Sequence, residues 1–432
     1  MKLTYYVLTA GVTAVVTFTL SLVILKLSTR FRLYPKIRER DVHTRPTPRL
    51  GGVAMFIGVL AAFWVASNLA QFDLIFRDTG RVLAILAAAL IIVLIGVADD
   101  IWDLDWLTKL AGQAIAAGIL VWQGVQLVTI PIGGVTVVPP VLGLALTVLA
   151  VVLVMNAVNF IDGLDGLVSG VVLIANTVFF AYSYFLTTSL QAEFEFFNLS
   201  SLLSAILIGA CAGFLPVNWH PAKMFMGDAG ALLVGLLMAA SAVSVTGGID
   251  PATLTSGSYL LPAFLPILLP LAVLIVPLLD FGLAVFRRLR AGKSPFSADR
   301  KHLHHRLLDM GHSHFHAVLI FYAWTAVVSV GFLLFLFIPA WSAATFIVVG
   351  LVLCAWLTLA PITRRKALES AAQRTEAVSE IHAGALGPLE SGVYDPLDAA
   401  AIDRDTGPVP VLGEFPEPLE PVIDILTRKE RP

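Results

Sequence analysis

The sequence is poor in cysteine and in charged residues, and both shortages narrow the class of protein. Its two cysteines, Cys211 and Cys354, each lie inside an apolar run, so we expect neither a disulfide framework nor a cysteine-based metal site. Charged residues make up 13% of the chain, whereas a typical soluble domain has about a quarter. Hydrophobic residues make up 58%. This composition excludes an ordinary soluble domain and indicates a polytopic membrane protein.

Long apolar runs recur along the chain and predict an all-α protein with about 11 transmembrane helices. The runs cover 5–27, 51–70, 82–98, 108–124, 140–158, 165–186, 200–217, 229–246, 259–283, 315–338 and 341–362. The first run is too long for a signal-peptide core and lacks a clear cleavage motif, so we expect it to remain as a span. The ninth run contains four prolines and is expected to be kinked or broken.

The distribution of Lys and Arg predicts how the spans are oriented. Basic residues crowd the loop 30–49, after the first run, and the loop 287–306, before the tenth. Both loops join an odd-numbered span to the next even-numbered one, so the positive-inside rule places both in the cytoplasm. The N-terminus then lies outside and the C-terminus lies in the cytoplasm.

Two further segments complete the predicted organisation. The stretch VQLVTIPIGGVTVVPP predicts a small periplasmic β-hairpin that turns at Gly133–Gly134. From residue 364 the apolar runs end, and acidic residues and prolines become frequent. We therefore expect a transmembrane domain over 1–363 and a cytoplasmic tail over 364–432 that is largely disordered.

Polar residues gather in five clusters, and the span count places every one of them at the cytoplasmic side. The clusters are RPTPRLGG (45–52), DDIWDLDWLTKLAGQ (99–113), NAVNFIDGLDGL (156–167), NWHPAKMFMGDAGA (218–231) and SPFSADRKHLHHRLL (294–308). Each cluster alone has a structural alternative: a turn with glycines at a close helix contact for TPRLGG, solvated helix flank for DD, a turn for DGLDG, a helix N-cap for GDAGA and an exposed stretch for HLHH. Their common side instead predicts a single site at the membrane surface.

The residue types in these clusters point to phosphate chemistry. The acidic members are Asp99, Asp100, Asp162, Asp165 and Asp228. If these carboxylates converge, they repel one another, and a divalent cation would relieve the repulsion. A few hard oxygen ligands suit Mg²⁺, with Mn²⁺ as an alternative, and His and Arg would face phosphate oxygens. Phosphoryl transfer needs mainly positioning and charge neutralisation, so the absence of a serine or cysteine nucleophile is no obstacle.

In this order the five clusters resemble the polyprenyl-phosphate N-acetylhexosamine-1-phosphate transferases of bacteria, over roughly residues 1–363. The resemblance implies ten or eleven membrane helices and transfer of a sugar-1-phosphate from a UDP-sugar to a lipid phosphate, with release of UMP. It implies that Asp99 and Asp100 lie beside the metal and the lipid phosphate, and that Asp228 binds Mg²⁺. Lys109 matches a lysine on the lipid-phosphate side. The neighbouring Asp103 and Asp105 are expected to be loop residues that cap the next helix.

On the nucleotide-sugar side the resemblance implies a second set of residues. Asn159, Asp162 and Asp165 match residues around the nucleotide-sugar, and their spacing of three would place them near one face of a helix. The basic and histidine residues that match are His302 as a catalytic residue, and His304, His305, Arg288, Arg300 and Arg45 as binding residues. Arg45 stands where some members of the family have lysine.

The fifth cluster is similar to that of the family branch that uses UDP-N-acetylglucosamine (UDP-GlcNAc). The branch that uses UDP-MurNAc-pentapeptide would show three consecutive histidines, and here Leu303 interrupts them. The resemblance thus implies transfer of GlcNAc-1-phosphate to undecaprenyl or decaprenyl phosphate at the cytoplasmic face of a bacterial inner membrane, which starts lipid-linked polysaccharide synthesis.

The sequence leaves several alternatives open. The same reaction with another UDP-N-acetylhexosamine or with UDP-MurNAc-pentapeptide would use the same motifs. An anion transporter is a distant alternative, supported only by the broken ninth run. No nucleic-acid partner is expected, and a homodimer remains open.

Overall fold

The computed structural model describes residues 2–31, 47–131, 135–189, 195–247, 275–290, 292 and 303–359. The chain divides into a compact unit, Met1–Leu368, and a second unit, Glu369–Pro432. All of the described residues belong to the first unit. The predicted cytoplasmic tail at 364–432 therefore lies outside the described residues.

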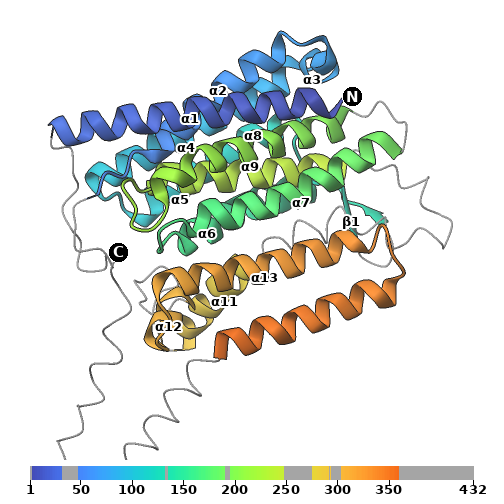
Figure 1. Ribbon diagram of the computed structural model, residues 1–432. Helices are drawn as coiled ribbons and strands as arrows, with labels where there is room; N and C mark the ends of the chain where they lie inside the picture. Colours follow the sequence, from blue (N-terminus) through green and yellow to red (C-terminus); the bar gives the residue numbers. More distant parts are fainter. Residues whose placement is uncertain are drawn as a thin grey trace, which may run out of the picture. The chain divides into compact units, whose positions relative to one another are not determined.

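The described part of the chain is built from long apolar helices (Figure 1). Eight of them are long and apolar enough to cross a membrane: α1 (Leu3–Phe31), α4 (Thr79–Trp102), α6 (Pro140–Ile161), α7 (Leu167–Ser189), α8 (Glu195–Asn218), α9 (Gly227–Gly247), α13 (His314–Leu334) and the helix Ala340–Leu359. A ninth candidate is α2 (Gly51–Ser67) followed by η1 (Ala70–Phe72) and α3 (Asp73–Arg77), with a bend of 95°. The apolar helix α5 (Trp106–Trp122) has 17 residues. An all-α, multi-pass membrane architecture is confirmed, while the count of 11 spans and the orientation of the termini stay predictions.

The ninth predicted span, 259–283, falls mostly outside the described residues, as do Pro262, Pro266 and Pro270. Its last part belongs to α11 (Ile275–Arg290), which contains Pro277 in its first turn and continues beyond residue 283. The last turn of α11 contains three arginines, whose charge suits the negative end of the helix dipole. A short helix, α12 (Leu303–Asp309), precedes α13.

The segment predicted to form a hairpin contains two short strands, β1 (Thr129–Pro131) and β2 (Val135–Val137). They pair antiparallel, with Ile130 opposite Thr136. The predicted turn at Gly133–Gly134 lies outside the described residues, and the side of the membrane on which the strands lie stays a prediction.

Helix α9 is the central helix of the described part. Of its apolar window 89% is buried, compared with 22% for α1 and 11% for Ala340–Leu359. Helix α9 packs against α2, α4, α6 and α8. Small residues allow this close approach: a Cβ atom on Gly96 of α4 would lie 2.2 Å from the Cα atom of Ala229. Lipid supplies no hydrophobic drive for helix association, so such small-residue contacts are a main source of packing energy in membranes.

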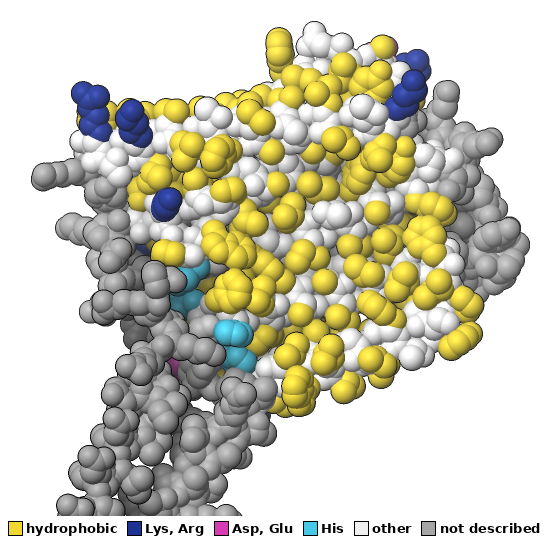
Figure 2. Space-filling model, viewed as in Figure 1, with side chains coloured by type: hydrophobic (Ala, Val, Ile, Leu, Met, Phe, Trp, Pro, Cys, Tyr) yellow, Lys and Arg dark blue, Asp and Glu magenta, His cyan; other side chains and the backbone are white. Residues whose placement is uncertain are grey.

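The outer helices show the reverse of a soluble amphipathic pattern. The buried residues of α1 are hydroxyl-bearing ones such as Thr9 and Thr13, and its exposed residues include Val7 and Val15. The Thr13 hydroxyl donates a hydrogen bond of 2.7 Å to the Thr9 carbonyl, which satisfies it within the helix. Figure 2 shows the consequence for one face of the molecule: hydrophobic side chains cover it, and the visible Lys and Arg side chains lie near its margins.

Candidate active site

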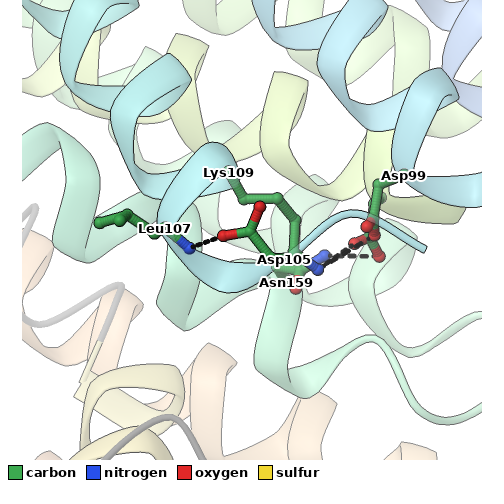
Figure 3. Close-up of polar contacts among 6 residues, drawn as sticks. Asp99, Asp105, Leu107, Lys109 and Asn159 are labelled. Atoms are coloured by element: carbon green, nitrogen blue, oxygen red, sulfur yellow. Dashed lines mark hydrogen bonds and ion pairs between the residues drawn. The ribbon is translucent and has the colours of Figure 1, made fainter. Parts of the chain in front are cut away.

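The acid pair Asp99–Asp100 lies within the last turn of α4, because this helix continues beyond the predicted end at residue 98 to Trp102. Asp103 then adopts a left-handed conformation (φ 53°), and its N–H donates to the Asp99 carbonyl, which ends the helix. Asp105 caps α5 by accepting a hydrogen bond of 2.9 Å from the Leu107 N–H (Figure 3). It also accepts one of 3.1 Å from the Thr108 N–H. The predicted capping role is thus confirmed for Asp105, whereas Asp103 ends the preceding helix.

The tight connection between α4 and α5 brings Lys109 back to the acid pair. Its ammonium nitrogen Nζ lies 3.1 Å from Asp99 Oδ2 and 3.7 Å from Asp228 Oδ2. Asp228 is in the first turn of α9, and its Oδ1 accepts a hydrogen bond of 3.1 Å from Asn159 Nδ2 of α6. Figure 3 shows the side chain of Lys109 extending toward Asp99. Four helices therefore contribute to one polar cluster.

Asp100 packs against the glycine that opens α9. Gly227 has φ +70°, and a Cβ atom on it would lie 2.4 Å from Asp100 Oδ2 and 2.3 Å from the Arg49 carbonyl. Only glycine fits this position without a shift of the backbone. The Arg49 segment is also fixed by backbone hydrogen bonds, since Gly52 N–H donates to the Met226 carbonyl at 2.9 Å. The described part of the first cluster, residues 47–52, is thereby held against FMGD of the fourth.

The residues of the third cluster lie partly in α6 and partly in the turn that follows it. The helix ends at Ile161, so Asn159, Asp162 and Asp165 do not share the helical face that their spacing predicted. Gly166 adopts φ +74° in the turn that follows. Burial raises the pKa of Asp162 to about 7, repulsion from Asp228 acts in the same direction, and the positive charge of Arg49 opposes it. Asp162 thus belongs electrostatically to the Asp228 cluster.

Asp165 is buried and points to a different partner. Its Oδ2 lies 2.7 Å from His220 Nδ1 and accepts a hydrogen bond of 3.0 Å from the Ala222 N–H. The same turn is fixed by Asn218, whose Oδ1 accepts hydrogen bonds from Gly166 N–H (3.1 Å) and the Ser169 hydroxyl (3.2 Å). The α6–α7 turn and the α8–α9 loop are therefore bound to each other.

The fifth cluster is described only in part. Arg45, Arg300 and His302 lie outside the described residues, and His304 and His305 belong to α12 without described side chains. Arg288 of α11 is buried, with its guanidinium carbon 5.5 Å from the centre of the Phe160 ring. Since Phe160 follows Asn159, this places Arg288 beside the third cluster.

Comparison with known proteins now adds to this geometry. A model of glycosyl transferase family 4 matches residues 82–246. The decaprenyl-phosphate N-acetylglucosaminephosphotransferase of Mycobacterium leprae is 43% identical over 338 residues, which cover 77% of this chain and 84% of the relative. The chain belongs to glycosyl transferase family 4. The family resemblance inferred from the motifs is thereby confirmed.

Further relatives extend across the family. The protein of the same name from Mycobacterium tuberculosis is 42% identical over 336 residues, 77% of this chain and 82% of the relative. A probable undecaprenyl-phosphate N-acetylglucosaminyl 1-phosphate transferase of Bacillus subtilis is 36% identical over 287 residues, 66% of this chain and 72% of the relative. The region matched by the family model contains the acid pair, Lys109, the third cluster and Asp228.

Three residues of the first and fourth clusters are not predicted from the sequence: Arg49, Asn218 and His220. Arg49 immediately precedes Leu-Gly-Gly at the start of α2, whereas the resemblance implies a binding role for Arg45 instead. For the fourth cluster the resemblance implies a role only for Asp228. The signal for His220 is that it precedes a proline in the same motif as Asp228 and stands outside any apolar run.

The described side chains can be tested for their fit to a divalent cation. Asp99 Oδ1 and Asp100 Oδ2 are buried and, within the described residues, lack a hydrogen-bond partner. Unused carboxylate oxygens of this kind are ligands that Mg²⁺ prefers. No three described His, Cys, Asp or Glu side chains are arranged to hold a metal alone. The arrangement therefore fits an ion that takes one or two carboxylates and completes its shell with water and substrate phosphates.

Proposed function

We propose that this protein transfers GlcNAc-1-phosphate from UDP-GlcNAc to a polyprenyl phosphate and releases UMP. The observation that carries the proposal is the convergence of four separate polar clusters on Asp228 at one end of the helices, in a chain of this family. The printed names of its relatives specify N-acetylglucosamine phosphate transfer and a decaprenyl or undecaprenyl phosphate. The site is then at the cytoplasmic face of a bacterial inner membrane, where a nucleotide-sugar is available.

Charge in the cluster favours a phosphate-bearing substrate together with a cation. The described carboxylates near Asp228 are those of Asp99, Asp100, Asp162 and Asp228 itself, and the basic groups near them are Lys109 and Arg49. When all are ionised, two negative charges remain in excess, which one divalent cation balances. At about 4 Å and an effective dielectric constant near 20, each close carboxylate pair costs about 4 kcal/mol, so this balance matters.

The protein's own groups have distinct parts in the proposed reaction. Of Asp99, Asp100 and Asp228, one or two would hold Mg²⁺, or Mn²⁺, whose shell water and substrate phosphates would complete. When bound, the ion would neutralise charge on the diphosphate of UDP-GlcNAc. Lys109 keeps Asp99 and Asp228 close together and can attract the phosphate of the lipid acceptor. Asn159 fixes the rotamer of Asp228 through its hydrogen bond. These residues position and neutralise, which is most of what phosphoryl transfer requires.

The position of the acidic groups at helix ends favours this function over transport. Transporters typically place ionisable residues and broken helices near the middle of the membrane. The described acidic residues of the site are at helix ends: the last turn of α4, the turn after α6 and the first turn of α9.

The decisive experiment is UMP release by purified protein with polyprenyl phosphate and Mg²⁺. UDP-GlcNAc, UDP-GalNAc and UDP-MurNAc-pentapeptide are compared as donors. We expect turnover with UDP-GlcNAc that stops when EDTA removes the metal and returns when Mg²⁺ is added. A preference for either other donor would correct the substrate, and no UMP release with all three would reject the enzymatic function.

A further inference from the structure

The Asp165–His220 pair stands beside the Asp228 cluster and is not used by the mechanism above. The side chain of Asp165 is 3% exposed, whereas that of His220 is 44% exposed. A buried carboxylate can only accept hydrogen bonds, so the proton between Asp165 Oδ2 and His220 Nδ1, 2.7 Å apart, belongs to the imidazole. The other ring nitrogen, Nε2, is then the one left for an external partner.

The His220 ring is held on its face as well as at its edge. The His314 ring, at the start of α13, stacks on it with the centroids 5.3 Å apart and the planes 9° from parallel. The Ala222 N–H donates to the same Asp165 oxygen, which fixes the backbone two residues after His220. An exposed side chain is seldom restrained from two directions, and such restraint is typical of groups that contact a substrate.

The position of His220 points to a particular substrate. At this end of the helices the charged groups form a series. Lys109 lies between Asp99 and Asp228. Asp162 comes next, and it is followed by Asp165 with its partner His220. Two substrates with phosphate groups meet in the proposed reaction. Since Lys109 is at one end of this series and serves the lipid phosphate, a second basic group at the other end would serve the nucleotide-sugar.

We propose that His220 binds a phosphate oxygen of the nucleotide-sugar through Nε2, and that Asp165 is its positioning residue. When the ring carries a proton on both nitrogens, it lies between a buried carboxylate and an anionic phosphate and is neutralised from both sides. Asp165, expected from the sequence to contact the nucleotide-sugar itself, acts through His220 instead. The proposal rests on the function given above.

Two isosteric substitutions separate binding from a merely structural role. In His220→Gln the amide nitrogen can take the place of Nε2, and the contact with Asp165 is lost. In His220→Asn the amide nitrogen can take the place of Nδ1 and keep the contact with Asp165, whereas the outer donor is lost. His220→Ala removes both.

The measurements are the KM for UDP-GlcNAc, the KM for polyprenyl phosphate, kcat and the unfolding temperature in detergent. We expect His220→Ala to raise the KM for UDP-GlcNAc about 10- to 100-fold, the range for a hydrogen bond to a charged group, with the KM for polyprenyl phosphate unchanged. His220→Asn should show the same KM defect at wild-type stability, and His220→Gln should recover part of the binding. Asp165→Asn should give a smaller rise in the same KM.

The proposal is overturned if Asn restores the KM and Gln does not, since His220 would then serve only to hold the loop. It is also overturned if the KM for UDP-GlcNAc stays at the wild-type value in His220→Ala, or if only the KM for polyprenyl phosphate rises. Calorimetric titration of UMP with Mg²⁺ provides a readout without turnover: binding should weaken in His220→Ala and His220→Asn. Wild-type protein without turnover but with His220-dependent UMP binding would reject the proposed function and retain this inference.

Discussion

Two helix contacts in this protein are both built from glycine against alanine, but they differ in what lies beside them. Where α4 meets α9, Gly96 lies against Ala229, next to Asp228. Where α1 meets α8, Gly213 lies against Ala14, and a Cβ atom there would be 2.3 Å from the Ala14 carbonyl oxygen. Both contacts bring backbones together, and the first lies directly beside Asp228, the residue on which the polar cluster converges. Close packing is thus a general means of association in this chain, and it becomes functional where it fixes the position of a charged group.

The largest effects should follow from removing a carboxylate at the α4–α9 contact. We expect Asp99→Asn, Asp100→Asn and Asp228→Asn each to lower kcat by about 10²- to 10³-fold or more, because each removes a charge fixed within the site. UMP release measures kcat, and membrane extraction shows whether the variant inserts. Asp103→Asn is the matched control, since Asn also tolerates a left-handed conformation and should keep wild-type turnover. Wild-type turnover in any of the three would remove that residue from the site.

Substitution of Lys109 should cause the next largest loss of activity. In Lys109→Met the nearly buried Asp99 faces Asp228 without the ammonium between them, so we expect kcat to fall about 10- to 100-fold, as for a lost charge-assisted contact. Lys109→Arg keeps the charge and should lose less. Steady-state kinetics with varied polyprenyl phosphate would show whether the acceptor KM rises as well. Equal losses in the Met and Arg variants would mean that geometry, not charge, is what Lys109 supplies.

The comparison of the two contacts can be tested directly with Gly96→Ala and Gly213→Ala. Each added methyl group enters occupied space and should lower the free energy of unfolding by about 1–3 kcal/mol. Only Gly96→Ala displaces the first turn of α9, so it should also reduce kcat per folded molecule by about tenfold, whereas Gly213→Ala should not. Thermal unfolding in detergent and turnover of the monodisperse fraction separate the two quantities. Equal kcat in both variants would contradict the positional role of the α4–α9 contact.

Substitution of Asp105 should have the smallest effect on kcat. It is an exposed N-cap of α5, and hydrogen bonding to Thr108 lowers the pKa of its carboxyl. Asp105→Ala removes the cap and should slightly lower the unfolding temperature, while kcat stays within about twofold of wild type. Asp105→Ser, which restores a capping oxygen, should recover the unfolding temperature. A large loss of kcat would show that Asp105 belongs to the site and is more than a cap.

Much of the site was predictable because the motifs are local and their order along the chain is informative. The parity of the spans predicted that Asp100, Asp162 and Asp228 lie at one side. The structure places Asp162 close enough to Asp228 for their charges to interact, and it packs Asp100 against Gly227, next to Asp228. The predicted helical face was wrong because it depends on where a helix ends. The spacing of Asn159, Asp162 and Asp165 fits a helical face, but α6 ends at Ile161 and sends Asp165 to His220 instead.

The sequence by itself determined the multi-pass membrane architecture and the family, and it predicted the acidic residues of the proposed site. Apolar run length and motif order are read along the chain without reference to contacts. Only the tertiary structure decided which side chains these acidic residues contact. Lys109 reaches both Asp99 and Asp228 because Asp103 turns the chain between α4 and α5. The Arg49 backbone and the Asp100 carboxylate can both approach residue 227 because glycine has no side chain there. Such pairings depend on distances between helices far apart in the sequence, which packing sets. The acid pair Asp99–Asp100 can be recognised in the sequence, but the residues that contact it in space cannot.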